Sequence, residues 1–169
     1  LAPQYVDNLL KKILTNDKMV KHLHLSLQSG SDSILKSMNR HYTGKEYLDI
    51  INSIRKEIPL FNFTTDIIVG FPGEREEDFH DTLKIVKEAD FSHVHTFRYS
   101  TRPGTKAAEM KDVIEEKIKK ERSQKVINLY TEQKINYYKK FDGKKSIFLS
   151  EKTKDGRTRG FNEYYIPVV

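Results

Sequence analysis

The sequence predicts an α/β fold in which helices cover parallel strands that form one side of a larger barrel. Helix-like and strand-like segments alternate over residues 5–100 at the spacing expected of βα units. The loops after the strand-like segments are rich in Gly, Ser, Pro and polar residues. Three strands are too few to close a barrel of this type, and the chain begins with Leu1, so we expect it to be a piece of a longer protein.

Three segments have the composition of strands. The first, residues 22–28, alternates Leu with His, Ser and Gln, which predicts one apolar and one polar face. The other two, residues 61–70 and 91–100, are rich in β-branched and aromatic side chains. Ligands of parallel βα folds bind at the carboxyl ends of the strands. The predicted binding rim therefore consists of residues 28–30, 69–74 and 99–105.

Helices are predicted around these strands. Residues 5–14 place their apolar side chains on one face. Thr43 and Glu46 form a capping box that opens a helix ending before Pro59. Two further helices are expected over residues 31–38 and about 75–89.

A different region begins after residue 110. A long charged helix is predicted up to Gly143. The tail then reads as β structure, with Lys154-Asp155-Gly156 as a hairpin turn. We place a domain boundary near 141–144, giving domains 1–141 and 142–169. The expected buried side of the long helix is Ile114, Ile118, Val126, Leu129 and Tyr130.

Composition excludes several classes of protein. The chain has no Cys, which rules out disulfides and thiolate-bound metal or iron–sulfur centres within it. It has no apolar run near the length of a membrane span. We therefore expect a cytoplasmic protein.

The net charge of +6 is concentrated in one segment. Residues 111–160 hold 15 Lys and Arg against 8 Asp and Glu, whereas the rest of the chain holds 15 against 16. A basic segment in an otherwise balanced protein is typical of contact with a polyanion such as RNA. A solvated Lys-rich helix is the alternative.

Two H-x-H pairs, His22/His24 and His93/His95, raise the question of a metal site. Imidazoles on neighbouring strands are suitable ligands for transition metals. All four histidines fall early in their strands, away from the predicted rim, and no Asp or Glu accompanies them at the strand starts. We therefore expect a polar barrel interior and no metal, with a metallohydrolase as the alternative.

Several rim residues have side chains suited to a small ligand. The Gln28 amide offers donors and an acceptor, next to Ser29, and Gly30 allows close backbone approach. Arg40 would pair with a carboxylate if it reached back over the rim. For each of these, an ordinary turn or surface position is the alternative.

Asp66 is the acidic residue of an otherwise apolar strand. A carboxylate there is costly unless it is paired, so we expect a partner, either a ligand group or a cation such as Arg40. The acidic residues of 74–78 stand at a helix start, where the helix dipole explains them, and we assign them no chemistry. Arg98 and Arg102 bracket the third rim segment and suit an anionic substrate, with plain solvent exposure as the alternative.

Three strings of the chain together resemble the methylthiotransferase branch of the radical S-adenosylmethionine (SAM) enzymes. They are HLHLSLQSGSDSILKSMNRHYT, TTDIIVGFPGEREEDFHDTL and FRYSTRPGTKAAEM, the last followed by a KKER helix, and they span residues 22–123 in order. The resemblance implies a partial (β/α)6 TIM-like barrel, of which this piece is the C-terminal half. The long helix and a truncated small β-barrel, the start of an RNA-binding TRAM domain, would follow.

The resemblance also implies an activity. The family adds a methylthio group to a carbon of its substrate, using two 4Fe-4S clusters and two roles for SAM, as radical source and as methyl donor. The clusters are held by cysteines that this chain lacks. The chain would therefore supply part of the SAM pocket and an RNA-binding surface, would carry no catalytic iron, and would be inactive alone.

The site residues that the resemblance implies belong to two groups. Gln28, Arg40 and Asp66 match a Gln, an Arg and an Asp that contact SAM in the wider superfamily. The full set expected at SAM is Gln28, Ser29, Gly30, Arg40, Asp66, Ile68, Val69, Gly70, Tyr99 and Ser100. The set expected at the RNA substrate is Arg98, Arg102, Lys144, Lys145, Arg157 and Arg159.

Three substrates occur within the family. Two are adenosines beside the tRNA anticodon, carrying a threonylcarbamoyl or an isopentenyl group, and the third is an Asp of a ribosomal protein. The basic segment favours tRNA, and the SLQSG and GFNEYYIPVV strings look most like the threonylcarbamoyl-adenosine enzymes. A non-enzymatic RNA-binding module is the alternative from another functional class.

Overall fold

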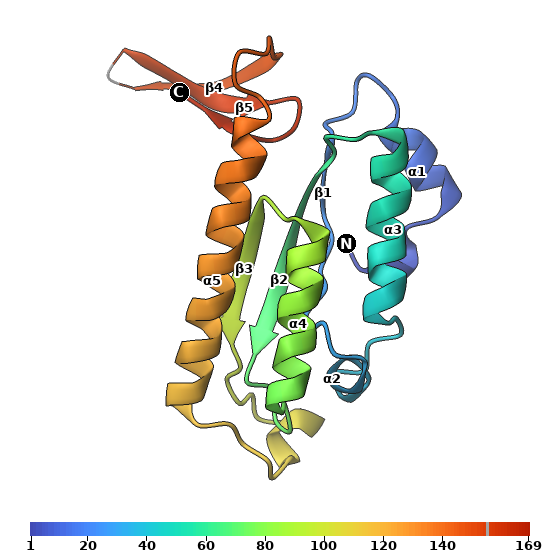
Figure 1. Ribbon diagram of the computed structural model, residues 1–169, viewed down its shortest axis with the longest axis vertical. Helices are drawn as coiled ribbons and strands as arrows, with labels where there is room; N and C mark the ends of the chain where they lie inside the picture. The colour runs from blue at the N-terminus through green and yellow to red at the C-terminus, as the bar shows by residue number, and fades with distance from the viewer. Residues whose placement is uncertain (155) are drawn as a thin grey trace.

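The computed structural model describes residues 1–154 and 156–169 and confirms the α/β fold (Figure 1). A parallel sheet with the order β1-β2-β3 is joined to an antiparallel sheet with the order β4-β5-β6. The strands of the parallel sheet are β1 (His22–His24), β2 (Asn62–Val69) and β3 (His93–Arg98). The helices are α1 (Asn8–Leu14), α2 (Asp32–Ser37), α3 (Gly44–Glu57), α4 (Glu76–Ala89) and α5 (Glu116–Lys139), with short 3-10 turns at Pro3–Tyr5 and Lys106–Glu109.

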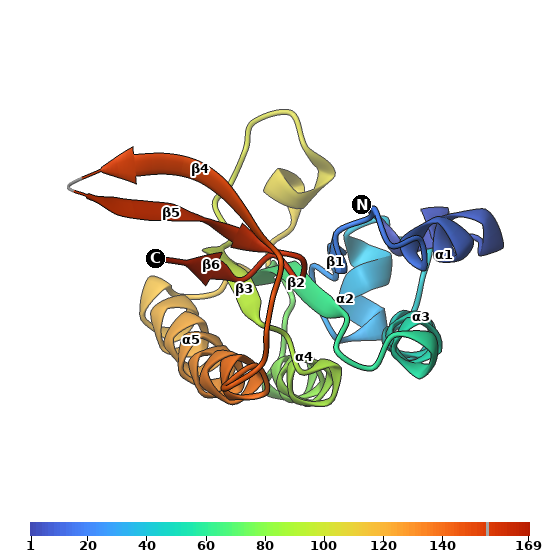
Figure 2. The same ribbon diagram turned by 90° about the horizontal axis from the view of Figure 1, so that it is seen from above.

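The side chains of the central strand β2 alternate between the two faces of the parallel sheet. Phe63, Ile67 and Val69 are fully buried and belong to the core formed with α3, α4 and α5. Asp66 and Ile68 alternate with them and remain partly exposed. Figures 1 and 2 show the three helices along one face, whereas the loop after β3 and the β4–β5 hairpin extend toward the other. We call this second face the open face.

Strand β1 is shorter than the predicted strand over residues 22–28. The chain still follows β2, because Leu25 N–H donates to Thr64 O at 2.9 Å and Gln28 N–H donates to Asp66 O at 2.8 Å. Between them the Thr65 hydroxyl accepts from Leu27 N–H at 2.9 Å and donates to Leu25 O at 2.7 Å. A side chain therefore replaces part of the backbone ladder, which the alternation of residue types does not reveal.

The capping box of Thr43 and Glu46 is confirmed at the start of α3. The long helix α5 is also confirmed, but its predicted buried side was partly wrong. Ile118 is exposed, whereas Arg122 and Gln133 are buried. Gln133 Nε2 donates to the carbonyls of Val86 and Lys87 at 3.0 Å each, which pairs acceptors at the end of α4.

The tail forms the antiparallel sheet from β4 (Phe148–Lys154), β5 (Arg157–Asn162) and β6 (Pro167–Val168). The β4–β5 hairpin is confirmed by its register, although Asp155 of the predicted turn lies outside the described residues. The tail contacts the start of the parallel sheet, where Asn62 Nδ2 donates to Tyr164 O at 2.7 Å. The domain boundary near 141–144 stays a prediction.

Among the described residues, no helix is both long and apolar enough to span a bilayer.

Candidate functional site

A cavity of about 460 Å³ lies at the carboxyl ends of β2 and β3, at the predicted rim. Its volume falls within the usual range for small-molecule sites. Five of the residues expected at SAM line it, together with both arginines of the third rim segment. These seven residues are Gln28, Asp66, Ile68, Tyr99, Ser100, Arg98 and Arg102. We call this cavity the rim pocket.

The other residues expected at SAM do not line the rim pocket. Ser29 and Gly30 are buried against α4, where Gly30 N–H donates to the Thr82 hydroxyl at 3.0 Å. Val69 faces the helical core. Arg40 is exposed and borders a separate hollow beside α2. Their roles, and that of Gly70, stay predictions.

Gln28 is held at the rim by an unusual backbone conformation. Its φ of 71° lies in the left-handed region, which a non-Gly residue occupies at some cost. The backbone is fixed on both sides, because its N–H donates to Asp66 O and its C=O accepts from Ile68 N–H at 2.9 Å. The residue is 8% exposed, so Gln28 is buried beside the pocket.

Tyr99 lines the rim pocket, and its hydroxyl has no hydrogen-bond partner among the residues that the structure describes. Its Oη is buried beside the pocket and does not face the open space. The ring packs edge-on against Phe71 at 5.3 Å, and the backbone accepts from Lys119 Nζ at 3.1 Å. A buried polar group without a partner costs about 1–3 kcal/mol.

Two residues that line the rim pocket, Phe97 and Ala107, lie outside the predicted rim segments. Phe97 could have been found, because it follows His95 by two residues and so shares its face of the strand. Phe71 and Thr105 fall within the predicted rim segments but were not singled out as ligand-binding residues. Ala107 enters from the loop beyond β3, and no sequence pattern indicates that this loop folds back over the sheet.

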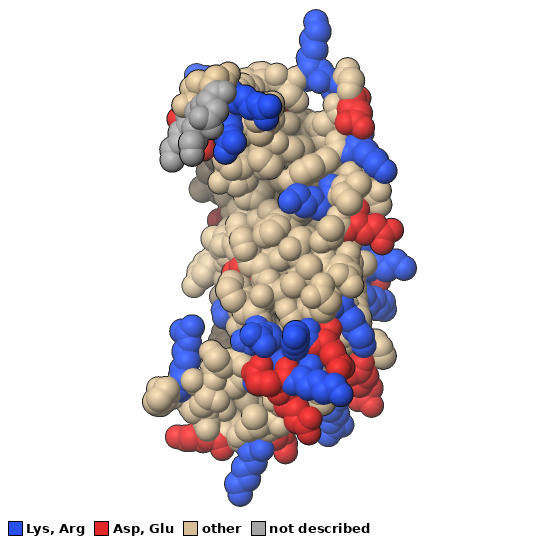
Figure 3. Space-filling view, turned by 90° about the vertical axis from the view of Figure 1, so that its left-hand side faces the viewer, with Lys and Arg blue, Asp and Glu red and all other residues tan. Residues whose placement is uncertain are grey.

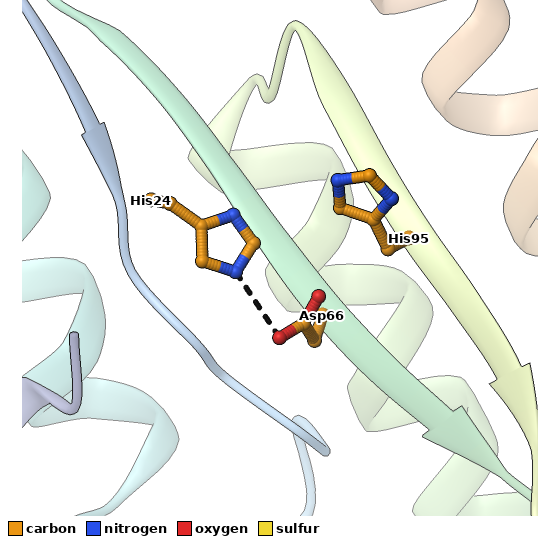
Figure 4. Close-up of side chains that lie close together, drawn as sticks. All are labelled: His24, Asp66 and His95. Atoms are coloured by element: carbon orange, nitrogen blue, oxygen red, sulfur yellow. Dashed lines mark hydrogen bonds and ion pairs between the residues drawn. The ribbon is translucent and has the colours of Figure 1, made fainter.

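The expected surroundings of the histidines and of Asp66 were wrong. Asp66 accepts from Ser26 Oγ at 3.2 Å and lies 3.1 Å from His24 Nε2 (Figure 4). The β1–β2 register places His24 opposite Thr64, two residues before Asp66 on the same face. The β2–β3 register places His95 directly opposite Asp66, so the histidines lie closer to it than their early positions in the strands suggest. The partner of Asp66 is thus His24, not Arg40.

A second cavity of about 770 Å³ adjoins the first part of the open face and the tail. His22 lies there, stacked on Tyr165 with ring centroids 4.6 Å apart. Burial and the neighbouring His24 lower the pKa of His22 to about 4. Burial likewise lowers the pKa of His93, helped by His95 and Lys134. Both imidazoles are therefore neutral at pH 7.

The rim is supported by a buried ion pair that the sequence analysis overlooked. Glu74 was attributed to a helix start and assigned no chemistry, but it is 3% exposed and lies 2.6 Å from Arg122 Nη1 of α5. It also accepts from Gly70 N–H at 3.1 Å. Burial raises the pKa of Glu74, although both partners act in the opposite direction. The pair joins the loop after β2 to the first turns of α5.

The basic residues predicted for RNA contact form two separate groups. Arg98 and Arg102 line the rim pocket, and Arg98 Nη1 lies 3.1 Å from Glu116. The tail group, Lys144, Lys145, Arg157 and Arg159, is exposed at the opposite end of the molecule (Figure 1). On the face shown in Figure 3, Lys and Arg mix with Asp and Glu toward the lower end, and a broad uncharged area crosses the middle.

Parallel strands, helices on one face and a pocket at the carboxyl ends define a ligand-binding segment of a βα barrel. The family model of the radical SAM superfamily matches residues 2–86, and the chain belongs to this family. The solved structure of coproporphyrinogen III oxidase from Escherichia coli, a radical SAM enzyme, has the same fold over 79% of this chain and 31% of its own, with a TM-score of 0.64 and 22% identity.

Curated relatives agree with the resemblance found in the sequence. The tRNA-2-methylthio-N(6)-dimethylallyladenosine synthase of Pelotomaculum thermopropionicum is 45% identical over 159 residues, 90% of this chain. The threonylcarbamoyladenosine tRNA methylthiotransferase of Thermotoga maritima is 41% identical over 161 residues, 95% of this chain. The chain spans 36% and 37% of the lengths of these two relatives.

Proposed function

We propose that this chain forms part of a radical SAM methylthiotransferase that modifies an adenosine beside the tRNA anticodon. The observation that carries the proposal is the similarity to tRNA methylthiotransferases over nine tenths of the chain or more. The position of the rim pocket supports it, because the pocket lies where a βα barrel binds its ligand.

The rim pocket has the donors and the apolar surface that SAM requires. Gln28 and Asp66 offer an amide and a carboxylate for the hydroxyl and ammonium groups, and the Tyr99 hydroxyl is buried without a partner among the described residues. Ile68 and Phe71 provide apolar contact for the adenine ring. When bound, SAM supplies the methyl group and the radical chemistry. The role of this chain is to bind and orient it.

The iron–sulfur clusters of the family do not fit this chain. Both would need thiolate ligands, and the sequence contains no Cys. The residues of this chain therefore hold neither cluster, and their part in the reaction is limited to binding SAM and the substrate.

The arginines of the rim and the exposed cations of the tail are the groups proposed to contact tRNA. Arg102 lines the pocket and is exposed, so it can meet a phosphate beside the reacting base. Relatives acting on dimethylallyladenosine and on threonylcarbamoyladenosine both match this chain at similar identity. The threonylcarbamoyl substrate remains our sequence-based prediction, with the other adenosine and a ribosomal-protein Asp as alternatives.

The test uses the intact protein that contains this chain, reconstituted with iron and sulfide. We expect it to release 5′-deoxyadenosine from SAM and to form a methylthio-nucleoside in tRNA, both measured by mass spectrometry. Supplying tRNA that carries either modified adenosine, and the ribosomal protein in parallel, identifies the substrate. Absence of both products with every substrate would reject the enzymatic proposal.

A non-enzymatic RNA-binding module gives a different result. In that case the protein would bind tRNA in a filter assay without SAM or iron, and no turnover would follow. The variant Asp66→Asn further distinguishes the enzyme from a non-enzymatic RNA-binding module. For the enzyme, it should weaken SAM binding and leave tRNA affinity nearly unchanged.

A further inference from the structure

We propose that His24, Asp66 and His95 bind one divalent transition-metal ion, of the zinc, cobalt or iron(II) class, on the open face of the parallel sheet. One ligand atom from each residue lies within 4.8 Å of the other two (Figure 4). Two imidazoles and one carboxylate form a known ligand set for such ions. The proposal does not depend on the proposed function.

The three side chains come from three neighbouring strands. His24 is on β1 opposite Thr64, and Asp66 is on β2 opposite His95 of β3. The parallel register thus places the ligands side by side on one face of a hydrogen-bonded sheet. Sites built on strands hold their geometry better than sites built on loops.

Outer hydrogen bonds already orient two of the three ligands. His24 Nδ1 lies 3.0 Å from the Thr64 hydroxyl, which leaves Nε2 directed at Asp66. Ser26 Oγ donates to Asp66 Oδ2 at 3.2 Å. Metal-binding histidines usually have such a partner on the second ring nitrogen, and its loss typically lowers metal affinity about 10–100-fold.

The spacing of His24 and Asp66 matches a coordination sphere. The distance from His24 Nε2 to Asp66 Oδ2 is 3.1 Å, and two ligands at zinc bond lengths in a tetrahedron lie about 3.3 Å apart. His95 is exposed, so its side chain can rotate to complete the set without repacking the core.

Charged groups of both signs lie near the three ligands. Lys134 of α5 lines the second cavity, as does the Leu1 ammonium, which donates to His24 O at 2.9 Å. The Asp66 carboxylate offsets part of the metal charge. Asp66 also lines the rim pocket, whereas His24 and His95 line the second cavity, so the ion would sit where the two cavities meet.

Cobalt titration of the complete 169-residue chain without an affinity tag tests the proposal. We expect one Co²⁺ per chain, visible absorption bands from nitrogen and oxygen ligands, and displacement by Zn²⁺. His95→Gln should weaken binding at least tenfold, because it removes one ligand and touches no core residue. His80→Gln is the matched control, since His80 lies 3.9 Å from Glu76 in a separate exposed pair.

The outcomes separate clearly. Absence of the visible bands, or bands that persist unchanged in His95→Gln, would overturn the proposal. If His80→Gln loses the bands and His95→Gln keeps them, the ion binds near α4, and the proposal is overturned as well. Thr64→Val, which removes the hydroxyl beside His24 Nδ1 and His22 Nε2, should lower affinity about 10–100-fold while circular dichroism stays unchanged.

Discussion

The hydroxyl of Tyr99 is a buried polar group without a partner next to the rim pocket. Most buried polar groups in proteins are paired, and this one is among six buried side-chain atoms without a partner in the part of the chain that the structure describes. No sequence pattern carries that information, because it depends on the loop beyond β3 and on Phe71 packing around the ring.

Removing the Tyr99 hydroxyl tests its role. In the intact protein, Tyr99→Phe should weaken SAM binding about 2–12-fold, the value of one ordinary hydrogen bond. The free energy of unfolding should stay equal or rise slightly, since an unpaired group is removed. Isothermal titration calorimetry measures the first and urea denaturation the second. Tyr5→Phe, at a 65% exposed position, is the control, and equal affinity in both variants would contradict the assignment.

His22 provides a pH dependence at the same scale. Its pKa is about 4 in the folded chain and about 6.5 when unfolded. The unfolded chain therefore binds more protons between these values, and the free energy of unfolding should fall as pH falls from 6.5 toward 4. His22→Gln should flatten this decline in urea denaturation at pH 7, 6 and 5. An equally steep decline in the variant would show that other groups cause it.

At the scale of elements, α5 is fitted closely to the rim. Lys119 packs its stem over Gly70 while its ammonium reaches Tyr99 O, and Arg122 pairs with Glu74. Two charged residues on the buried side of a helix are invisible to a search for apolar periodicity. That is why Ile118 was expected inside and Lys119 was not.

Substitutions by Ala at Gly70 and Gly73 test how closely α5 packs against the rim. Both have φ near +80°, at 72° and 83°, so Ala costs each of them about 1–2 kcal/mol of backbone strain. Only at Gly70 would the new methyl group collide with the Lys119 stem. Gly70→Ala should therefore lower the free energy of unfolding by about 1–3 kcal/mol more than Gly73→Ala. Equal losses of the free energy of unfolding in the two variants, measured by chemical denaturation, would mean that α5 does not pack tightly against Gly70.

The elements were largely predictable, because caps, turns and alternation are local signals. The capping box of α3, the strand β2 and the β4–β5 hairpin followed directly from such signals. The rim pocket was predicted in position, because parallel strands must end at one edge. The contact between Asp66 and His24 was missed, since it depends on the register of β1 against β2, which no local pattern encodes.

At the scale of the whole molecule, charge lies at both ends. We predict that changing the four exposed cations Lys144, Lys145, Arg157 and Arg159 to Gln weakens tRNA binding by the intact protein. The slope of log affinity against log salt should become shallower by up to about 0.7–0.9 for each RNA phosphate that the variant no longer neutralises. Filter binding at several salt concentrations measures it.

The control for this variant removes the same charge elsewhere. It carries Gln at the four exposed positions Lys12, Lys18, Lys36 and Lys56. If both variants lose affinity and salt dependence equally, net charge and not the tail surface governs binding. An unchanged slope in the tail variant would remove these four residues from the proposed RNA surface.

The length of helix α5 also sets the distance between the rim and the tail sheet. Its 24 residues correspond to about 36 Å, with Lys119 beside the rim at one end. At the other end, Tyr137 Oη donates to Leu60 O at 2.8 Å, close to where the tail sheet begins. A substrate that touches both the rim and the tail must bridge a distance of that order. A folded RNA arm is long enough to bridge that distance, and a free nucleoside is not.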